Sequence, residues 1–278
     1  MTQQIYYKGE QVDEKRYFCT MIFSDTHTHI YLDAFDTDRA AMLQRAEAAG
    51  VKYLFLPDID KKSRRKMLEV AAEHAAMCFP MAGLHPTSVG ADYREQLALS
   101  RDLLDTKTVV GIGECGIDMY WDQTHVAAQK EVFVSQLEWS LETGLPVSIH
   151  IRDAFNEVFE VLTQFGNTRF KGVFHCFTGG LEEAERAIGY GFHLGIGGII
   201  TFKKSPLPQV IKHIDPGHIV LESDAPFLAP SPYRGKRNEP AWIPFVAEKL
   251  AETWGVSLQN VAEATTHNAL QLFKPESI

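Results

Sequence analysis

The sequence predicts an α/β fold, namely a closed (β/α)8 TIM barrel, regular or distorted, of the metal-dependent hydrolase type. Three observations predict the barrel: eight short apolar or β-branched runs recur along the chain, segments with helical periodicity separate most of them, and 278 residues is a typical length for one barrel. Near-continuous apolar strands that alternate with helices indicate a parallel sheet covered by helices.

The predicted strands are short, and their near-continuous apolar character indicates burial on both faces. They cover residues 20–24, 51–57, 77–84, 107–113, 145–149, 170–174, 192–197 and 218–221. Eight such strands in one sheet predict the closed barrel rather than a small sandwich or bundle.

Four segments carry apolar residues at helical spacing. Their apolar positions are Met42, Ala46 and Ala49 in the first, Phe133, Leu137 and Leu141 in the second, Trp242, Val246, Leu250 and Trp254 in the third, and Leu258, Val261, Thr265, Ala269 and Leu272 in the fourth. Asp36 and Ser257 are the predicted N-caps of the first and last helices, and Gly50, Gly144 and Gly255 mark predicted helix ends.

Residues 23–278 are expected to form a single TIM-barrel hydrolase domain, preceded by an N-terminal extension at residues 1–22. The extension lies outside the strand–helix pattern, and no linker interrupts the rest. An open doubly wound sheet is the alternative, but the sequence contains neither G-x-G-x-x-G after the first strand nor G-x-x-x-x-G-K-[ST].

Composition limits the possible functions. The formal net charge of −9 disfavours extended binding to duplex nucleic acid, so any contact with a polyanion must be local or mediated by metal ions. The cysteines Cys19, Cys78, Cys115 and Cys176 form no C-x-x-C pair, which favours reduced thiols. Because neither a signal peptide nor an apolar run of membrane length is found, we expect a cytoplasmic protein without membrane contact or an obligate protein partner.

A histidine-containing motif, SDTHTHI, follows the first predicted strand at residues 24–30. Side chains alternate faces along a strand, so Asp25, His27 and His29 point in one direction, toward the barrel axis. An H-x-H pair alone is weak evidence for a metal site. Barrel enzymes build their sites from the ends of several strands, however, and the other ends here carry Glu114, His150, His175, Glu222 and Asp224.

Four imidazoles and two carboxylates exceed the ligands of one tetrahedral zinc but suit two ions about 3.5–4 Å apart. The predicted ligands are His27, His29, Glu114, His150, His175 and Asp224, with Glu114 as the expected bridge. The alternative is that each residue only caps its own strand, which would leave uncompensated charge buried. Asp25 and Glu222 lie deeper in their strands and are expected to support the ligands.

A set of ordered motifs carries a family resemblance. The motifs are DTHTHI (25–30), GLHP (83–86), GIGECGID (111–118), IHIRDA (149–154), HCFTG (175–179), LESDAP (221–226) and RGKRNEP (234–240). Over residues 21–273 the chain resembles the TatD metal-dependent deoxyribonucleases, whose barrel is similar to that of the amidohydrolases.

The resemblance implies that His27, His29, Glu114 and Asp224 surround one divalent ion, and that His150 and His175 surround a second ion shared through Glu114. It implies Mg²⁺ or Mn²⁺ as the active metals, although imidazole ligands also accept Zn²⁺. Glu114 and Asp224 are the expected catalytic residues, because Asp224 can accept a proton from water and return it to the leaving oxygen.

Substrate contacts are expected from loops at the same edge. Arg234, Lys236 and Arg237 follow the Asp224 strand, while Arg152 and His85 follow other strands, and all five are candidates for binding phosphate, with solvated, paired or turn-forming side chains as the alternative. Aromatic candidates for stacking on bases, with core or lid packing as the alternative, are Tyr120, Trp121, Phe177, Phe202 and Phe227.

Three functions fit these patterns. The first is hydrolysis of DNA phosphodiester bonds, as an exonuclease on ends or single strands, because the acidic composition disfavours duplex binding. The second is a dinuclear amidohydrolase or esterase acting on a small molecule. Many such relatives use a carbamylated lysine as the bridge, so Glu114 favours the nuclease. The third is a binding protein whose metals only stabilise the fold or hold a phosphorylated ligand.

Overall fold

The computed structural model describes residues 5–7, 10–12 and 21–275. Segments β1 (Ile5–Tyr7) and β2 (Glu10–Val12) pair antiparallel, and the rest of the predicted 1–22 extension lies almost entirely outside the described residues. In the described part of the chain, no helix is both long and apolar enough to cross a membrane.

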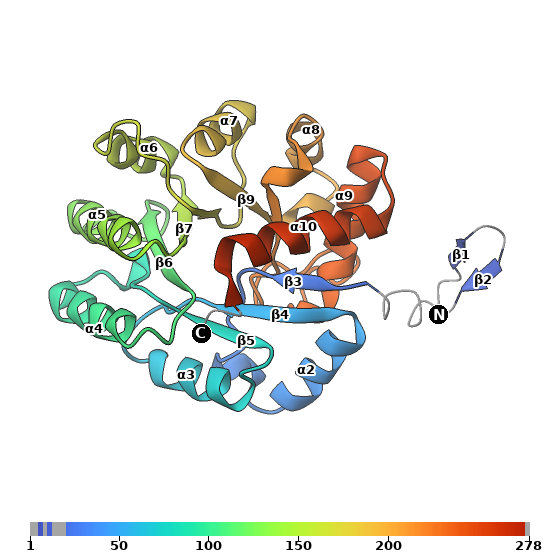
Figure 1. Cartoon of the computed structure of the whole chain (residues 1–278), viewed down its shortest axis with the longest axis horizontal. Coiled ribbons are helices and arrows are strands. Elements are labelled where there is room, and N and C mark those ends of the chain that lie inside the picture. Colours follow the sequence, from blue (N-terminus) through green and yellow to red (C-terminus); the bar gives the residue numbers. More distant parts are fainter. Residues whose placement is uncertain (1–4, 8–9, 13–20, 276–278) are drawn as a thin grey trace.

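A parallel eight-stranded sheet confirms the predicted barrel, with its strands in sequence order (Figure 1). The strands are β3 (Phe23–Asp25), β4 (Val51–Leu56), β5 (Cys78–Ala82), β6 (Gly111–Asp118), β7 (Val147–Arg152), β8 (Gly172–Phe174), β9 (Phe192–Ile196) and β10 (Ile219–Leu221). The two edge strands meet where the Thr26 backbone N–H donates to Leu221 O at 2.9 Å. The sheet thus curls into a nearly closed barrel.

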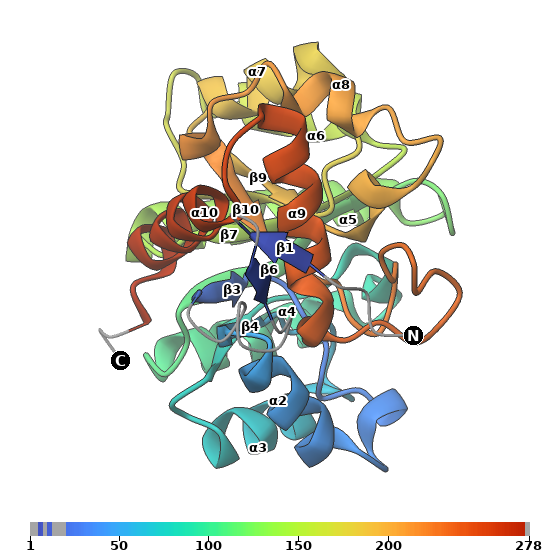
Figure 2. The ribbon, with the colours of Figure 1, turned by 90° about the vertical axis from the view of Figure 1, so that its right-hand side faces the viewer.

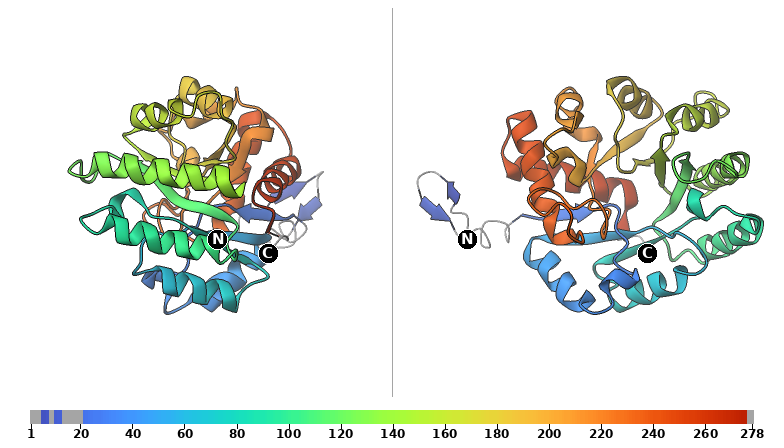
Figure 3. Two further views of the ribbon diagram at one scale, coloured as in Figure 1. Left: turned by 60° about the vertical axis from the view of Figure 1, so that its left-hand side comes forward. Right: turned by 180° about the vertical axis from the view of Figure 1, so that it is seen from behind.

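Helices surround the sheet, as the figures show from several sides (Figures 1, 2 and 3). They are α2 (Arg39–Ala48), α3 (Arg64–Glu73), α4 (Tyr93–Asp105), α5 (Val126–Thr143), α6 (Phe155–Thr163), α7 (Leu181–Gly189), α8 (Leu207–Ile211), α9 (Ile243–Trp254) and α10 (Leu258–Phe273). Gly144 and Gly255 end α5 and α9 in the left-handed conformation, and the Ser257 side chain caps α10, as predicted. The N-cap of α2 is Asp38 rather than the predicted Asp36.

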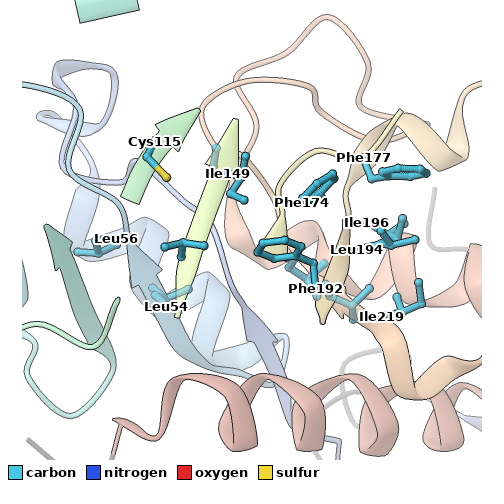
Figure 4. Packing of buried hydrophobic residues seen from close by; sticks show 14 of the residues in the cluster. Leu54, Leu56, Cys115, Ile149, Phe174, Phe177, Phe192, Leu194, Ile196 and Ile219 are labelled. Carbon is cyan, nitrogen blue, oxygen red and sulfur yellow. The ribbon is translucent and has the colours of Figure 1, made fainter. Parts of the chain in front are cut away.

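Alternate residues of each strand face opposite sides. The outward set packs against the helices, as the Phe174 ring does against Phe159 of α6. Figure 4 shows Phe174, Phe192, Leu194 and Ile219 of this set, and the rings of Phe174 and Phe192 lie 4.9 Å apart. This apolar layer between strands and helices forms most of the core.

The inward set changes character along the barrel. Its lower part is an apolar cluster in which the Phe273 ring of α10 lies 4.4 Å from the Phe55 ring. Val173 and Val220 belong to this apolar cluster, and the next inward residues toward the carboxyl ends of their strands are polar, namely His175 and Glu222. Apolar side chains therefore fill the interior of the barrel, and polar side chains gather at the carboxyl ends of the strands.

Two predicted strand ends are corrected. Strand β6 does not stop before Glu114 but continues to Asp118, and β7 continues past His150 to Arg152. The prediction treated these polar residues as breaks in apolar runs, whereas ladder pairing of Cys115 with Ile149 and of Asp118 with Arg152 extends both strands. The longer strands place Asp118 at the mouth of the barrel.

Candidate metal centre

The H-x-H segment follows β3 and is hydrogen-bonded to the segment that follows β10. His27 O accepts the Asp224 backbone N–H at 2.9 Å, and the His29 N–H donates to Ala225 O at 2.8 Å. These bonds join residues almost 200 positions apart and bring Asp224 beside both histidines. His29 Nε2 lies 3.5 Å from Asp224 Oδ1 and 3.2 Å from His27 Nε2.

Glu114 is buried at the centre of the site, and its two carboxylate oxygens face different partners. Oε2 lies 3.0 Å from His27 Nε2 and 3.4 Å from His29 Nε2. Oε1 lies 2.9 Å from His150 Nδ1 and 3.9 Å from His175 Nε2. This is the arrangement expected of a carboxylate that bridges two cations.

The structure thus brings all six predicted ligands into one cluster. Their ligand atoms form overlapping groups within 4.8 Å, including His27 with His29 and Asp224, and His27 with Glu114 and His175. A third group joins His150 and Glu114 to His85. The cluster therefore also contains His85, which the sequence had placed among the phosphate-binding candidates.

Each predicted histidine ligand has its second ring nitrogen beside an outer partner. His27 Nδ1 lies 2.9 Å from Ser148 Oγ, and His29 Nδ1 lies 2.9 Å from the Tyr31 hydroxyl. That hydroxyl donates to Pro57 O, so it accepts from His29, and in the neutral ring the lone pair of His29 is on Nε2, which faces the cluster.

Carboxylates lie beside the outer ring nitrogens of the other two histidines, hydrogen-bonded in His150 and at ion-pair distance in His175. His150 Nε2 donates to Asp118 Oδ2 at 2.8 Å, and His175 Nδ1 lies 3.0 Å from Glu222 Oε1. A side chain at Gly195 would bring its Cβ to 2.1 Å from Glu222 Oε2, so only glycine leaves room for this carboxylate. Such partners orient metal-ligating imidazoles and fix their tautomers.

His85 has the opposite arrangement. Its Nδ1 accepts the Thr87 backbone N–H at 3.1 Å, so in the neutral ring the hydrogen is on Nε2. Burial lowers the pKa of His85, which favours the neutral form. His85 Nε2 lies 3.2 Å from Glu114 Oε1 and presents a donor to the site rather than a lone pair.

The electrostatics of the cluster are those of a cation site. Burial and the neighbouring His175 lower the pKa of His27 to about 3, which keeps it neutral. Burial would also lower the pKa of His29, but hydrogen bonds to Asp224 and Glu114 outweigh it and raise that pKa to about 9. The nearby histidines outweigh burial and hold the pKa of Glu114 well below its usual range. Protons on these histidines must leave when a cation binds.

The donor set fits divalent metals. Ligands about 2.0–2.1 Å from a shared ion lie roughly 3 Å from one another, which matches the separations of the inward nitrogen and oxygen atoms given above. The chain supplies four imidazoles, whose outer nitrogens are hydrogen-bonded in His27, His29 and His150 and lie beside Glu222 in His175. It also supplies two carboxylates, Glu114 and Asp224, with which no arginine or lysine of the described residues forms an ion pair. Divalent cations bound here would accept the lone pairs of the imidazoles and balance the charge of the two carboxylates.

Replacing Asp118 tests the role of the outer partners. We expect Asp118→Asn to weaken metal binding at the His150 position about 10- to 100-fold, because an amide accepts the His150 N–H less strongly. Competition with a fluorescent chelator would measure the affinities. Asp153→Asn is the matched control, since Asp153 is exposed and asparagine tolerates its positive φ of 53°. Equal affinities in both variants would contradict this role.

The predicted phosphate-binding residues are placed differently from one another. Arg234 lies over the Phe202 ring at 4.3 Å, and Lys236 lies near the Tyr233 ring. Arg237 donates to both carboxylate oxygens of Asp38 and to Ala34 O, so its guanidinium ties the loop to α2.

Arg152 stacks on Tyr120, with Cζ 4.0 Å from the ring centroid. Among the described residues Arg152 forms no ion pair with a carboxylate, so the paired alternative is not observed for this side chain. Phe177 is 2% exposed and packs against Phe155, so it cannot stack on a base. Phe227 is 51% exposed, and its ring lies 6.2 Å from that of His29.

Sequence reasoning missed Asp118, Ser148 and Tyr31. A signal was present for two of them, because Ser148 and Asp118 are an even number of positions from His150 and Glu114 in the same strands, whereas Tyr31 lies in a turn after β3. Residues at even spacing share a face, so the alternation that predicted the ligands also indicates Ser148 and Asp118.

The chain matches known proteins over almost its whole described length. The family model for TatD related DNases matches residues 24–274. A metal-dependent hydrolase of Bacillus subtilis, YabD, described as uncharacterized, is 37% identical over 91% of this chain and 99% of its own. A protein of Erwinia amylovora named 3′-5′ ssDNA/RNA exonuclease TatD is 31% identical, over 86% of this chain and 95% of its own. The crystal structure of the TatD homologue YjjV of Escherichia coli superposes with a TM-score of 0.84, at 29% identity, over 91% of this chain and 98% of that one.

Proposed function

This chain belongs to the family of TatD related DNases and is a metal-dependent hydrolase; we propose that it hydrolyses DNA phosphodiester bonds, as an exonuclease on single strands or chain ends, with two divalent cations. The observation that carries the proposal is the Glu114 carboxylate, whose oxygens face His27 and His29 on one side and His150 and His175 on the other. The name of the Erwinia relative supports nucleic acid as the substrate.

Cations at this position, Mg²⁺ or Mn²⁺ in our proposal, would supply a water with lowered pKa as nucleophile and neutralise charge on the phosphate. The chain provides the proton transfer. Of the two carboxylates in the cluster, the Asp224 side chain is 14% exposed and that of Glu114 3%, so Asp224 is the carboxylate that substrate reaches more directly. Bonding to His29 and the nearby histidines outweigh burial and lower the pKa of Asp224, so it is ionised and can accept a proton from water.

Other residues hold the phosphate. His85 directs its Nε2 hydrogen into the site and can donate to a phosphate oxygen, whereas the inward nitrogens of the ligands present lone pairs. Arg152 at the end of β7 and Arg234 and Lys236 on the loop after β10 supply positive charge, and Arg237 fixes that loop. A local set of cations suits a short stretch of single strand better than an extended duplex.

The proposal is tested with chelator-stripped protein and oligonucleotides labelled at the 3′ or the 5′ end. Single- and double-stranded DNA, and RNA because the Erwinia relative carries both names, are incubated while Mg²⁺, Mn²⁺ or Zn²⁺ is restored one at a time. We expect a ladder of products shortened from one end, fastest on single strands and abolished by chelator.

A small-molecule hydrolase is the second candidate, since the Bacillus subtilis relative is described only as a metal-dependent hydrolase. Intact oligonucleotides under every metal, together with metal-dependent hydrolysis of a small ester or amide, would replace the nuclease proposal with this one. Metal binding that raised the melting temperature without any turnover would instead favour a binding protein.

A further inference from the structure

Two neighbouring aromatic rings are exposed on the loop that follows β6. Trp121 is 69% exposed and Tyr120 54%, the highest values among the large hydrophobic residues of the described chain. Their rings meet edge to face at 88°, with centroids 5.1 Å apart. Because aromatic side chains are enriched at interfaces, two adjacent exposed rings form a candidate binding surface.

This loop is anchored to the metal centre by one carboxylate. Asp118 Oδ1 accepts the backbone N–H groups of Tyr120 at 2.9 Å and of Trp121 at 3.0 Å, while Oδ2 holds the His150 imidazole. The Gln129 side chain fixes the Asp118 backbone: its Oε1 accepts the Asp118 N–H, and its Nε2 donates to Asp118 O. Because three residues span at most about 11 Å, Trp121 stays within one or two nucleotides of the cluster.

The Arg152 guanidinium completes this surface. Arg152 lies opposite Asp118 in the backbone ladder between β6 and β7. Its guanidinium Cζ lies 4.0 Å from the Tyr120 ring centroid and 5.6 Å from the Trp121 ring centroid. Among the residues that the structure describes, no carboxylate forms an ion pair with Arg152, so its N–H edges remain available for an anion. A ring face beside a free guanidinium suits one nucleotide, with the base on the ring and the phosphate on the arginine.

We propose that Tyr120, Trp121 and Arg152 form a nucleobase shelf, which stacks an unpaired base next to the scissile phosphate and makes the enzyme select single-stranded or frayed ends. The inference rests on the proposed nuclease function and adds a substrate-recognition site to it. Duplex pairing buries both faces of a base in the stack, so only an unpaired base can reach Trp121. Stacking is tolerant of sequence, so the shelf selects unpaired bases over paired ones rather than one base over another.

The test compares two single-stranded oligodeoxynucleotides that differ only in their terminal three positions, which carry either thymine or an abasic tetrahydrofuran. For the wild type we expect kcat/KM to be about 5- to 100-fold higher with the bases present. Trp121→Ala should remove most of this preference while leaving cleavage of the abasic substrate and the metal content unchanged. Trp121→Phe should keep most of the preference, because a ring remains.

Leu141→Ala is the matched control, since Leu141 is a 45% exposed hydrophobic residue on α5; it should behave as the wild type. A second readout needs no turnover: with chelator present, oligothymidylate should quench tryptophan fluorescence in the wild type and less in Trp121→Phe.

Several results would overturn the shelf. One is a wild type that cleaves both substrates equally, and another is a Trp121→Ala variant that keeps the full preference. Loss of self-association in Trp121→Ala, without a change in preference, would identify the surface as a protein interface instead. Failure of the wild type to cleave any oligonucleotide would instead reject the nuclease function itself, and the shelf with it.

Discussion

Glu114→Gln is expected to reduce kcat at least about 10³-fold and to leave at most one metal ion bound per chain. The amide keeps the shape of the carboxylate but removes the negative charge that both halves of the site share, and its NH₂ group cannot act as a ligand. A loss of about 4 kcal/mol of transition-state stabilisation corresponds to this factor. Single-turnover kinetics and metal analysis after gel filtration measure the two effects.

Thermal stability gives an independent readout of the same substitution. A ligand at 1,000 times its dissociation constant stabilises the folded state by about 4 kcal/mol, so metal should raise the melting temperature of the wild type much more than that of Glu114→Gln. Glu138→Gln, an exposed change on α5, is the control and should match the wild type. A Glu114→Gln variant that binds two ions and turns over normally would remove the bridge from the account.

Asp224→Asn is expected to lower kcat about 10³-fold or more with little change in KM. Asparagine can still contact one cation through its carbonyl but cannot accept a proton from water, so the chemical step suffers more than substrate binding. The fold should be retained, because asparagine tolerates the positive φ of 56° at this position.

A pH profile of kcat, with the bound metal measured at each pH, separates proton transfer from metal loss in this variant. The wild type should lose kcat as the pH falls through the pKa of Asp224, which lies below its usual value, and the residual rate of Asp224→Asn should lack this limb. A variant with more than a tenth of the wild-type kcat at saturating metal would show that another group accepts the proton.

The barrel could be predicted from the sequence because its strands are buried on both faces and read as apolar runs. Strand ends at polar residues were less predictable: Glu114 and His150 interrupt the apolar pattern, but β6 and β7 continue past them. Pairing between neighbouring strands, which no local pattern records, decides where these strands end.

The candidate ligands could be proposed because barrel strands all end at one edge, so residues far apart in the chain meet there. Orientation could not be predicted in the same way. The two directions of the Glu114 oxygens, the reversed tautomer of His85 and the stacking of Arg152 on Tyr120 depend on contacts between different strands and loops. Arg237 shows the same limit, because its hydrogen bonds to Asp38, the N-cap of α2, cannot be inferred from the motif RGKRNEP.

Anomalous diffraction from crystals of the protein grown with Mn²⁺ tests the central claim most directly. We predict two peaks about 3.5–4 Å apart, one on each side of the Glu114 carboxylate, with His27, His29 and Asp224 around one and His150 and His175 around the other. A single peak, or peaks away from these six side chains, would contradict a dinuclear centre at the mouth of this barrel.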